Sequence, residues 1–364
     1  MTGSVIRQSF APYQRKAFNR QASASTKRMT TPVPGHTYRR SHAHHTRSAT
    51  LASVVVANPT SFENLVMFPL VASGAGAMSS NAEMPAANYV TLDMGLASGQ
   101  FEITEVTEQG SIPELRVVNK GALPVLIVDG EELVGAKQNR VVNLTILVPS
   151  HSELTIPVSC VEAGRWRAKS RRFSSVPRAQ YSSGRAKRMA SVTHSMATTG
   201  LHHSDQSEVW SDIADMCSRL EARSSTGAME ALFVEYAPFL DDCVSACQPV
   251  GGQVGALFAV DDSIIGFDLF DREQTLTALL PKLVRSVAVD ALDHRGVGAL
   301  SRVADAKGAN TFTTGLFLDA VGTASSQVTP AVGLGEDVRL TGEGVIGGAL
   351  VHEGRVVHLS AFSQ

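Results

Sequence analysis

The chain has 364 residues, of which 43% are hydrophobic and 18% charged, and its formal net charge is -2. This length and composition are typical of a globular protein with one large domain or two moderate ones. Its four scattered cysteines exclude a disulfide framework and favour a reducing, cytoplasmic setting, and its longest apolar run, residues 51–72, is too often interrupted to predict a membrane-spanning helix.

Residues 1–50 carry nine Lys and Arg and no Asp or Glu, whereas the remaining chain carries 23 basic against 34 acidic residues. With few large apolar residues and no regular period, this segment predicts a disordered basic tail. We consider three interpretations of it: a passive tail or a start site assigned too far upstream, an organellar targeting peptide, and a nucleic-acid contact. The folded part is expected to span residues 51–364.

The segment 51–160 consists of short apolar or alternating runs broken by turn residues, a pattern typical of β-strands. The clearest runs are 53–56, 65–71, 89–92, 101–106, 114–118, 124–128, 140–147 and 153–159. Asn119-Lys120-Gly121 and Asp129-Gly130 predict tight turns, because Asn, Asp and Gly tolerate positive backbone angles. The Ala- and Ser-rich piece 73–87 is expected to be a loop.

Residues 163–204 interrupt this pattern with nine Lys and Arg and no acidic residue, and we interpret them as a long basic insertion. A helical part, 205–294, follows. Its first helix begins near Asp205, which forms a capping-box pattern with Glu208. A second helix follows Thr226, a hairpin turns at Asp261-Asp262, and a third helix begins at Asp271.

The C-terminal part, 311–364, predicts strands again, at 311–318, 337–341, 345–351 and 356–362. Strands, then about three helices and a hairpin, then strands give an α+β fold. Because a terminal hairpin needs a sheet to cover its face, we expect these last strands to pack beside or on the N-terminal ones and complete an antiparallel β-rich part. Residues 51–364 are therefore predicted to form one integrated domain.

Two polar segments are candidates for chemistry. The first, DGEELVGAKQNRVVN at 129–143, lies between two buried strands, and its glycines allow a ligand to approach the backbone. Its carboxylates and lysine are types that transfer protons, although a turn with solvated charges remains the alternative. Its candidate residues are Glu131, Glu132, Lys137, Gln138, Asn139 and Arg140.

The second segment, IPVSCVEAGRWRAKSRR at 156–172, takes a strand into the basic insertion. Arginines can bind phosphate in a bidentate manner and a tryptophan can stack on a base, so a nucleotide would use both features; a solvated loop is the alternative. The candidates are Glu162 as an acid or base, with Arg165, Trp166, Lys169, Arg171 and Arg172 as phosphate or base contacts. Cys160 is interpreted as a buried, inert thiol, and no spacing predicts a metal site.

Several phrases of these segments, in the same order, carry a resemblance to a known family. They are ITEVTEQGSIPELRVVN, VDGEELVGAKQNRVVN, IPVSCVEAGRW, SDQSEVW, GQVGALFAVDDSIIGFDLFD and VGLGEDVRLTGEGVIGGALVHEGRVVHLSAF. Over residues 60–364 the chain resembles the ARG and rhodanese-phosphatase-superfamily-associated protein domain, in which ARG denotes ADP-ribosylglycohydrolase. The resemblance places the family's polar core on Glu131, Glu132, Lys137, Gln138, Asn139, Arg140, Glu162, Arg165 and Trp166, and it implies neighbours in ADP-ribose and phosphate metabolism without an established catalytic residue.

The sequence thus favours a domain that binds or processes an ADP-ribose-like or other phosphate-bearing nucleotide. A non-catalytic binding or scaffold domain is the alternative, and nucleic-acid binding through the basic segments is a weaker one. The sequence indicates no membrane association, and it specifies neither a cofactor nor a protein partner.

Overall fold

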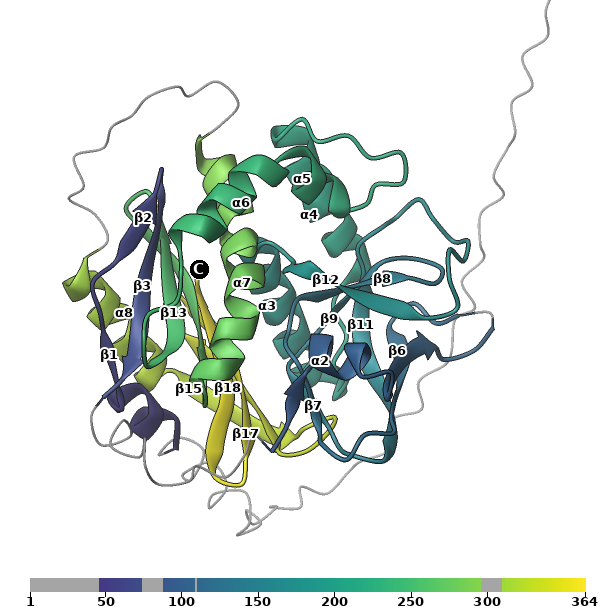
Figure 1. Ribbon diagram of the computed structural model, residues 1–364, viewed down its shortest axis with the longest axis horizontal. Helices are drawn as coiled ribbons and strands as arrows, with labels where there is room; N and C mark the ends of the chain where they lie inside the picture. The colour runs from purple at the N-terminus through teal and green to yellow at the C-terminus, as the bar shows by residue number, and fades with distance from the viewer. Residues whose placement is uncertain (1–45, 74–87, 109, 296–309) are drawn as a thin grey trace, which may run out of the picture.

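The computed structural model describes residues 46–73, 88–108, 110–295 and 310–364. In this part of the chain, helices α3 (Ser182–Thr199) and α7 (Glu273–Arg295) lie between a large sheet and a smaller β-rich half (Figure 1). The sheets are antiparallel apart from one short parallel pairing. The predicted α+β class is confirmed.

The large sheet has nine strands and joins both ends of the described chain. In order across the sheet, eight strands are β1 (Val54–Val56), β3 (Leu65–Ala72), β13 (Gln253–Val260), β14 (Ser263–Phe270), β18 (Arg355–Ser363), β17 (Val345–His352), β16 (Glu336–Gly342) and β15 (Ser325–Pro330). The ninth, β2 (Thr60–Phe62), pairs with β3. The C-terminal strands therefore extend the sheet that the N-terminal strands begin.

Alternation along the strands gives this sheet two buried faces. Phe258 faces a core shared with the long helix α7 (Glu273–Arg295), while its neighbour Leu257 faces a second core shared with α8 (Thr311–Thr323). Side chains of a strand point alternately to opposite faces, so consecutive apolar residues can fill both cores. The helices α4 (Gln206–Arg219), α5 (Glu230–Glu235) and α6 (Ala237–Ala246) add to the α7 side.

The smaller β-rich half has a six-stranded and a three-stranded sheet around a third core. The six strands in order are β12 (Phe173–Ala179), β8 (Glu131–Gly135), β9 (Arg140–Val142), β11 (Ser152–Cys160), β6 (Glu114–Asn119) and β5 (Phe101–Glu105). The three are β10 (Ile146–Val148), β7 (Val125–Ile127) and β4 (Val90–Thr91), and the short helix α2 (Leu92–Ala97) follows β4. Buried side chains on both sheets fill this core.

One predicted element is wrong. The run 311–318, expected as a strand, begins α8, whose first turn is closed by a capping box between Asn310 and Thr313. The basic insertion 163–204, for which no helix or strand was predicted, contains β12 and the 18-residue helix α3 (Ser182–Thr199). The expected loop at 73–87 lies outside the described residues except at Ser73.

The folded part also begins earlier than residue 51. Residues 46–52 are helical, and Arg47 is buried, where its Nη2 donates to the carbonyl oxygens of Gly322 and Ala324 at 2.9 Å each. Residues 1–45, which we predicted to be disordered, lie outside the described residues. Within the assigned tail, residues 46–50 thus belong to the folded part.

Candidate functional site

Four of the candidate residues line one open groove of about 620 Å³ at the outer end of the six-stranded sheet. One wall is the segment that follows β11, and the other is the loop between α4 and α5 together with the first turns of α5. The lining residues are Glu162, Gly164, Arg165, Trp166, Arg167, Lys169, Arg223, Ser224, Ser225, Thr226, Ala228, Glu230, Ala231 and Val234.

Backbone contacts hold the two walls together. Glu162 and Ala228 form an isolated antiparallel bridge, and the amide of Gly164 donates to the carbonyl of Thr226 at 2.7 Å. A Cβ placed on Gly164 would lie 3.0 Å from that carbonyl oxygen, which is tighter than most real contacts. Glycine at this position therefore lets the walls approach closely.

Glu162 and Arg165 form the floor of the groove. The Arg165 Nε donates to Glu162 Oε2 at 2.8 Å, the Thr226 hydroxyl donates to Oε1 at 2.9 Å, and the Asn139 amide donates to Oε2 at 3.2 Å. Burial alone would raise the pKa of Glu162, but these hydrogen bonds outweigh it and hold the pKa below its ordinary value. Glu162 is thus a fully engaged, ionised carboxylate.

A second carboxylate lies behind this floor. Arg165 Nη2 donates to Asn139 Oδ1 at 3.1 Å, and Asn139 Nδ2 donates to Glu132 Oε1 at 3.3 Å. Glu132 in turn accepts from Arg178 Nε at 2.5 Å, and burial raises its pKa although Arg178 offsets part of that effect. Glu132 does not line the groove but belongs to the network that holds its floor.

Trp166 projects at the edge of the groove and is 48% exposed. The ammonium of Lys137 lies 5.4 Å from the ring centroid and the guanidinium of Arg140 lies 5.8 Å from it. Such cation–π contacts fix an aromatic ring that still presents surface to solvent. Arg140 itself is fully buried, and its Nε and Nη2 make no hydrogen bond within the described residues.

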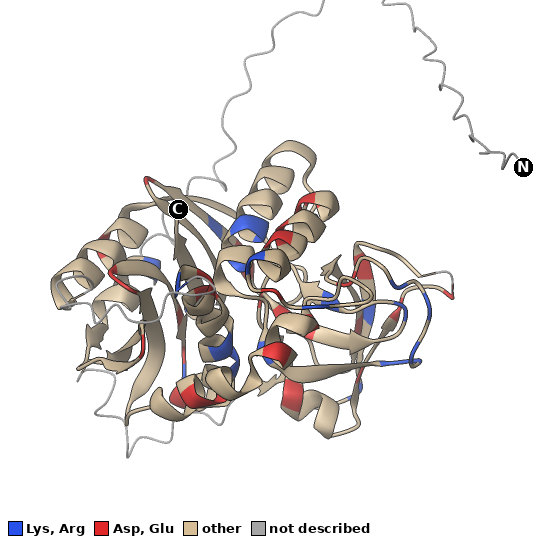
Figure 2. Cartoon of the chain, turned by 90° about the horizontal axis from the view of Figure 1, so that it is seen from above, with Lys and Arg blue, Asp and Glu red and all other residues tan. Residues whose placement is uncertain are grey.

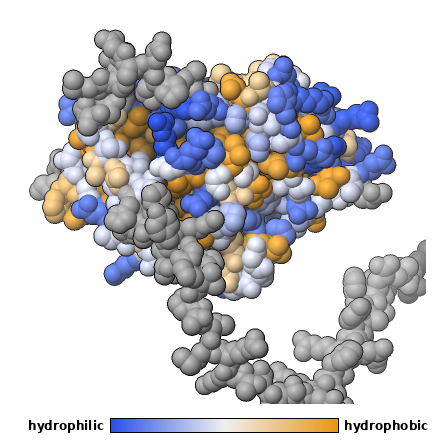
Figure 3. All heavy atoms as spheres, turned by 90° about the horizontal axis from the view of Figure 1, so that it is seen from below, coloured by the Kyte–Doolittle hydropathy of each residue, from blue (hydrophilic) through white to orange (hydrophobic). Residues whose placement is uncertain are grey.

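The rim of the groove is cationic. Arg167, Lys169 and Arg223 are exposed and have no acidic partner among the described residues. Figure 2 shows Lys and Arg on the loops at the end of the molecule that holds the six-stranded sheet, and the face in Figure 3 is strongly hydrophilic at that same end. A phosphate would find unneutralised positive charge here.

The remaining candidates do not meet in the groove. Glu131 is buried and accepts from Lys282 Nζ at 2.6 Å and from the Val128 amide at 2.8 Å, and Gln138 donates to the Glu162 carbonyl at 2.8 Å. Arg172 pairs with Glu102 of β5 at 2.8 Å, and Arg171 is exposed outside the groove. These four residues thus lie in structural contacts or on the surface.

Cys160 lies beneath this region and is fully buried. Burial raises the pKa of its thiol to about 11, and Arg140 offsets only part of that effect. A thiol that stays protonated at neutral pH is a poor nucleophile, so the geometry agrees with an inert role.

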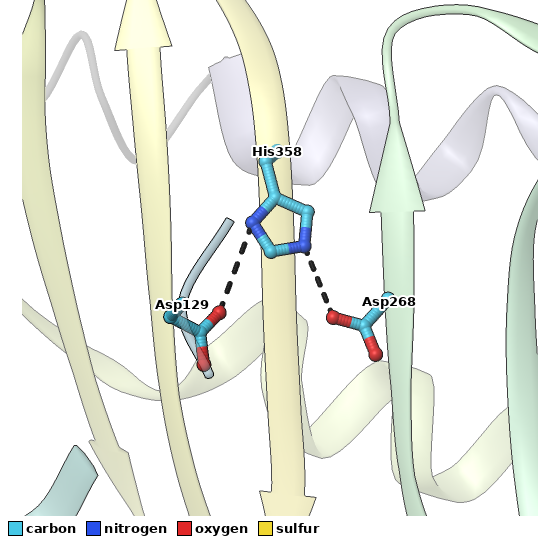
Figure 4. A group of neighbouring side chains, drawn as sticks. All are labelled: Asp129, Asp268 and His358. Atoms are coloured by element: carbon cyan, nitrogen blue, oxygen red, sulfur yellow. Dashed lines mark hydrogen bonds and ion pairs between the residues drawn. The ribbon is translucent and has the colours of Figure 1, made fainter. Parts of the chain in front are cut away.

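Sequence reasoning missed a second cluster of buried charges where the two β-rich halves meet. Arg185 on α3 donates to Asp129 at 3.1 Å and to Asp268 at 2.7 Å, and His358 Nε2 lies 3.0 Å from Asp268 (Figure 4). One oxygen or nitrogen atom from each of Asp129, Asp268 and His358 lies within 4.8 Å of the other two, as metal ligands would. Arg185 already occupies both carboxylates, so the cluster is a salt-bridge network. The one sequence signal for this cluster was that the residues of α3 show no regular apolar spacing.

Among the described residues, no helix is long and apolar enough to cross a membrane. A family model, described as the ARG and Rhodanese-Phosphatase-superfamily-associated Protein domain, matches residues 53–362. The comparison with curated proteins and that with solved structures found no match.

Proposed function

Because the chain belongs to the ARG and Rhodanese-Phosphatase-superfamily-associated Protein domain family, we propose that its groove binds a phosphate-bearing nucleotide of the ADP-ribose type. The observation that carries this proposal is the exposed Trp166 on one concave surface with three cations, Arg167, Lys169 and Arg223, that have no acidic partner in the described part of the chain. Phosphate oxygens would bind the cations and a base would stack on the indole ring.

The hydroxyls of the opposite wall support the same ligand class. Ser224, Ser225 and Thr226 line the groove across from the cationic segment, and Ala231 and Val234 give the wall an apolar part. A nucleotide offers charged, hydroxylated and aromatic portions, and the groove presents a complementary surface for each. The volume of about 620 Å³ is within the usual range for small-molecule sites.

The pKa shifts and positions of Glu162 and Glu132 favour binding of the nucleotide over its catalytic turnover. A general acid or base near neutral pH needs a pKa shifted toward 7, whereas hydrogen bonds hold the pKa of Glu162 below its ordinary value. Glu132 has a raised pKa but lies behind the floor of the groove. We therefore propose a non-catalytic binding domain that accompanies enzymes of ADP-ribose or phosphate metabolism, with processing of the nucleotide as the second candidate.

Calorimetric titration of the full chain with ADP-ribose, ADP and inorganic phosphate tests the proposal. We expect ADP-ribose and ADP to bind, and the double variant Arg167→Ala with Lys169→Ala to weaken binding by about tenfold or more, since each lost charged hydrogen bond contributes about 1.5 kcal/mol. No heat from any nucleotide at millimolar concentration would rule the groove out as a nucleotide site.

Two further measurements separate the alternatives. Lys120→Ala, an exposed lysine on the turn after β6, serves as the matched control and is expected to leave affinity unchanged. Chromatography of ADP-ribose after incubation with the protein distinguishes binding from turnover, because only turnover yields a product. If Glu162 were the acid or base of an enzyme, Glu162→Gln would abolish that product. Tight, steeply salt-dependent binding of an oligonucleotide would instead favour nucleic-acid recognition.

A further inference from the structure

A second concavity of about 680 Å³ lies between α3 and the start of α4, next to the C-terminal residues. It shares no lining residue with the nucleotide groove. Small residues on α3, Ala186 and Ala190, leave it open, and polar groups surround it. The polar lining consists of Ser183, Lys187, Ser191, His194, Asp205, Glu208, Ser363 and Gln364.

The cleft narrows inward to a pocket of about 10 Å³, with room for about one water-sized group. The two concavities share Lys187, Ser191, Asp205 and Glu208, so the pocket forms the inner end of the cleft. Gln180 and Arg188 line only the inner pocket, and they are 1% and 2% exposed. Both are therefore buried polar side chains on its wall.

These two side chains have unused hydrogen-bonding atoms. Arg188 Nη1 donates to the Val142 carbonyl at 2.8 Å, and Nη2 lies 3.6 Å from Asp129, but Nε and Nη2 make no hydrogen bond within the described part of the chain. Gln180 Oε1 likewise accepts none there. Leaving buried polar atoms without a partner costs about 1–3 kcal/mol each, so the pocket favours an occupant that satisfies them.

The required occupant must accept from a guanidinium and donate to an amide oxygen. A hydroxyl group does both, whereas a carboxylate or phosphate dianion cannot donate and an ammonium group cannot accept. The inner end is thus chemically suited to a hydroxyl group.

The charges at the mouth of the cleft further limit the class of ligand that can bind. Asp205 and Glu208 are exposed carboxylates, whereas Lys187 is already paired with Asp212. This negative rim repels anions, and Arg188 at the inner end repels cations. Neutral hydroxyls can donate to the carboxylates and accept from Ser191 or Lys187.

We propose that this cleft binds a neutral, polyhydroxylated small molecule, such as a pentose or cyclitol, with one hydroxyl between Arg188 and Gln180. The ligand class differs from the anion proposed for the groove. The two proposals can therefore fail separately.

Saturation-transfer NMR on the full chain with D-ribose, myo-inositol and ribose 5-phosphate tests this site. We expect signals from at least one neutral compound at millimolar concentration, and no signal from the phosphate ester that depends on Glu208. Glu208→Ala, an exposed change, and Gln180→Met, a change of similar shape, should each weaken binding by about tenfold. Circular dichroism shows whether the buried variant folds, and the Glu208 variant suffices where it does not.

Lys169→Ala in the groove is the matched control and should leave these signals intact. The proposal is overturned if neither neutral compound gives a signal, or if affinity is unchanged in Glu208→Ala. Equal binding of ribose 5-phosphate at the cleft would also contradict it, because the acidic rim is the feature that excludes anions.

Discussion

Glu132 and Arg178 are two buried ions that hold each other in place, with Nε and Oε2 2.5 Å apart. We predict that Arg178→Met lowers the free energy of unfolding by about 3–5 kcal/mol, because it leaves the Glu132 carboxylate buried with Asn139 as its one polar side-chain partner among the described residues. Adding Glu132→Gln should recover much of that loss, since the unpaired charge is removed. Urea unfolding of the three variants measures both effects.

The exposed pair of Arg116 and Glu153, at 2.6 Å, provides the control. Arg116→Met should change the urea midpoint little, because solvent screens an exposed ion pair. If the double variant of Glu132 and Arg178 were as unstable as Arg178→Met alone, packing of the arginine stem, and not the stranded charge, would be the cause.

Asp290 is a buried carboxylate on α7 with no cationic partner within 4.0 Å among the described residues. It accepts from the Ser183 amide at 3.3 Å, and burial raises its pKa to about 6. Because its folded pKa exceeds the unfolded value of about 3.9, the folded state gains stability from the protonated form at low pH and loses it as the pH rises through about 6.

We therefore predict that Asp290→Asn raises the free energy of unfolding by about 1–3 kcal/mol at pH 8 and changes it little at pH 4. The amide keeps an acceptor for Ser183 without placing a charge in the core. Chemical denaturation at several pH values checks this, with the exposed Asp262→Asn as control. A variant that is equally destabilised at both pH values would contradict the charge argument.

At the scale of elements, Arg47 joins the helix at residues 46–52 to the C-terminal end of α8 by donating to two carbonyl groups there. We predict that a chain starting at residue 51 has a free energy of unfolding about 1–3 kcal/mol below that of a chain starting at residue 46, because the two carbonyl groups lose their donor. Matched urea unfolding curves of the two chains test it. Superimposable curves would show that Arg47 adds no stability.

The sequence predicted most strands because their apolar alternation and turn residues are local signals. It failed at α8, whose Thr, Phe and Val content resembles a strand, while the deciding feature is the Asn310–Thr313 cap. It also failed at α3, because that helix buries Arg185 and Arg188 on its inner face, and charged residues there erase the expected apolar stripe.

The candidate site could be predicted only in part for the same reason. The segment at 162–169 was identified by its Trp and cations, and it does line the groove. The opposite wall at 223–234 was missed, because its Ser and Thr residues carry no distinctive pattern and come close only through tertiary pairing. Arg178, assigned to the same basic insertion, instead belongs to the buried network behind the floor.

At the scale of the whole molecule, Arg185 ties Asp129 of the smaller β-rich half to Asp268 of the large sheet. We propose that residues 51–364 fold as one domain and that residues 46–50, which are helical in the structure, belong to the same domain. The two tryptophans report on different regions, since Trp166 follows β11 and Trp210 lies on α4. Trp166→Phe and Trp210→Phe should therefore give coincident unfolding transitions, after correction for stability.

Separate midpoints in the two single-tryptophan chains would contradict a single cooperative unit. Arg185→Met provides a stronger test, because it removes four hydrogen bonds at the junction and leaves two carboxylates buried. We expect a loss of at least about 3 kcal/mol in this variant. The loss should appear equally with both fluorescent reporters.

The position of β18 in the large sheet affects how the chain can fold. This last strand lies between β14 and β17, and it supplies His358 to the buried network. Until β18 is in place, β14 and β17 each have an open edge, and open edges favour pairing with other chains. Deleting residues 355–363 would therefore remove an interior strand of the sheet and leave two unpaired edges where it had been.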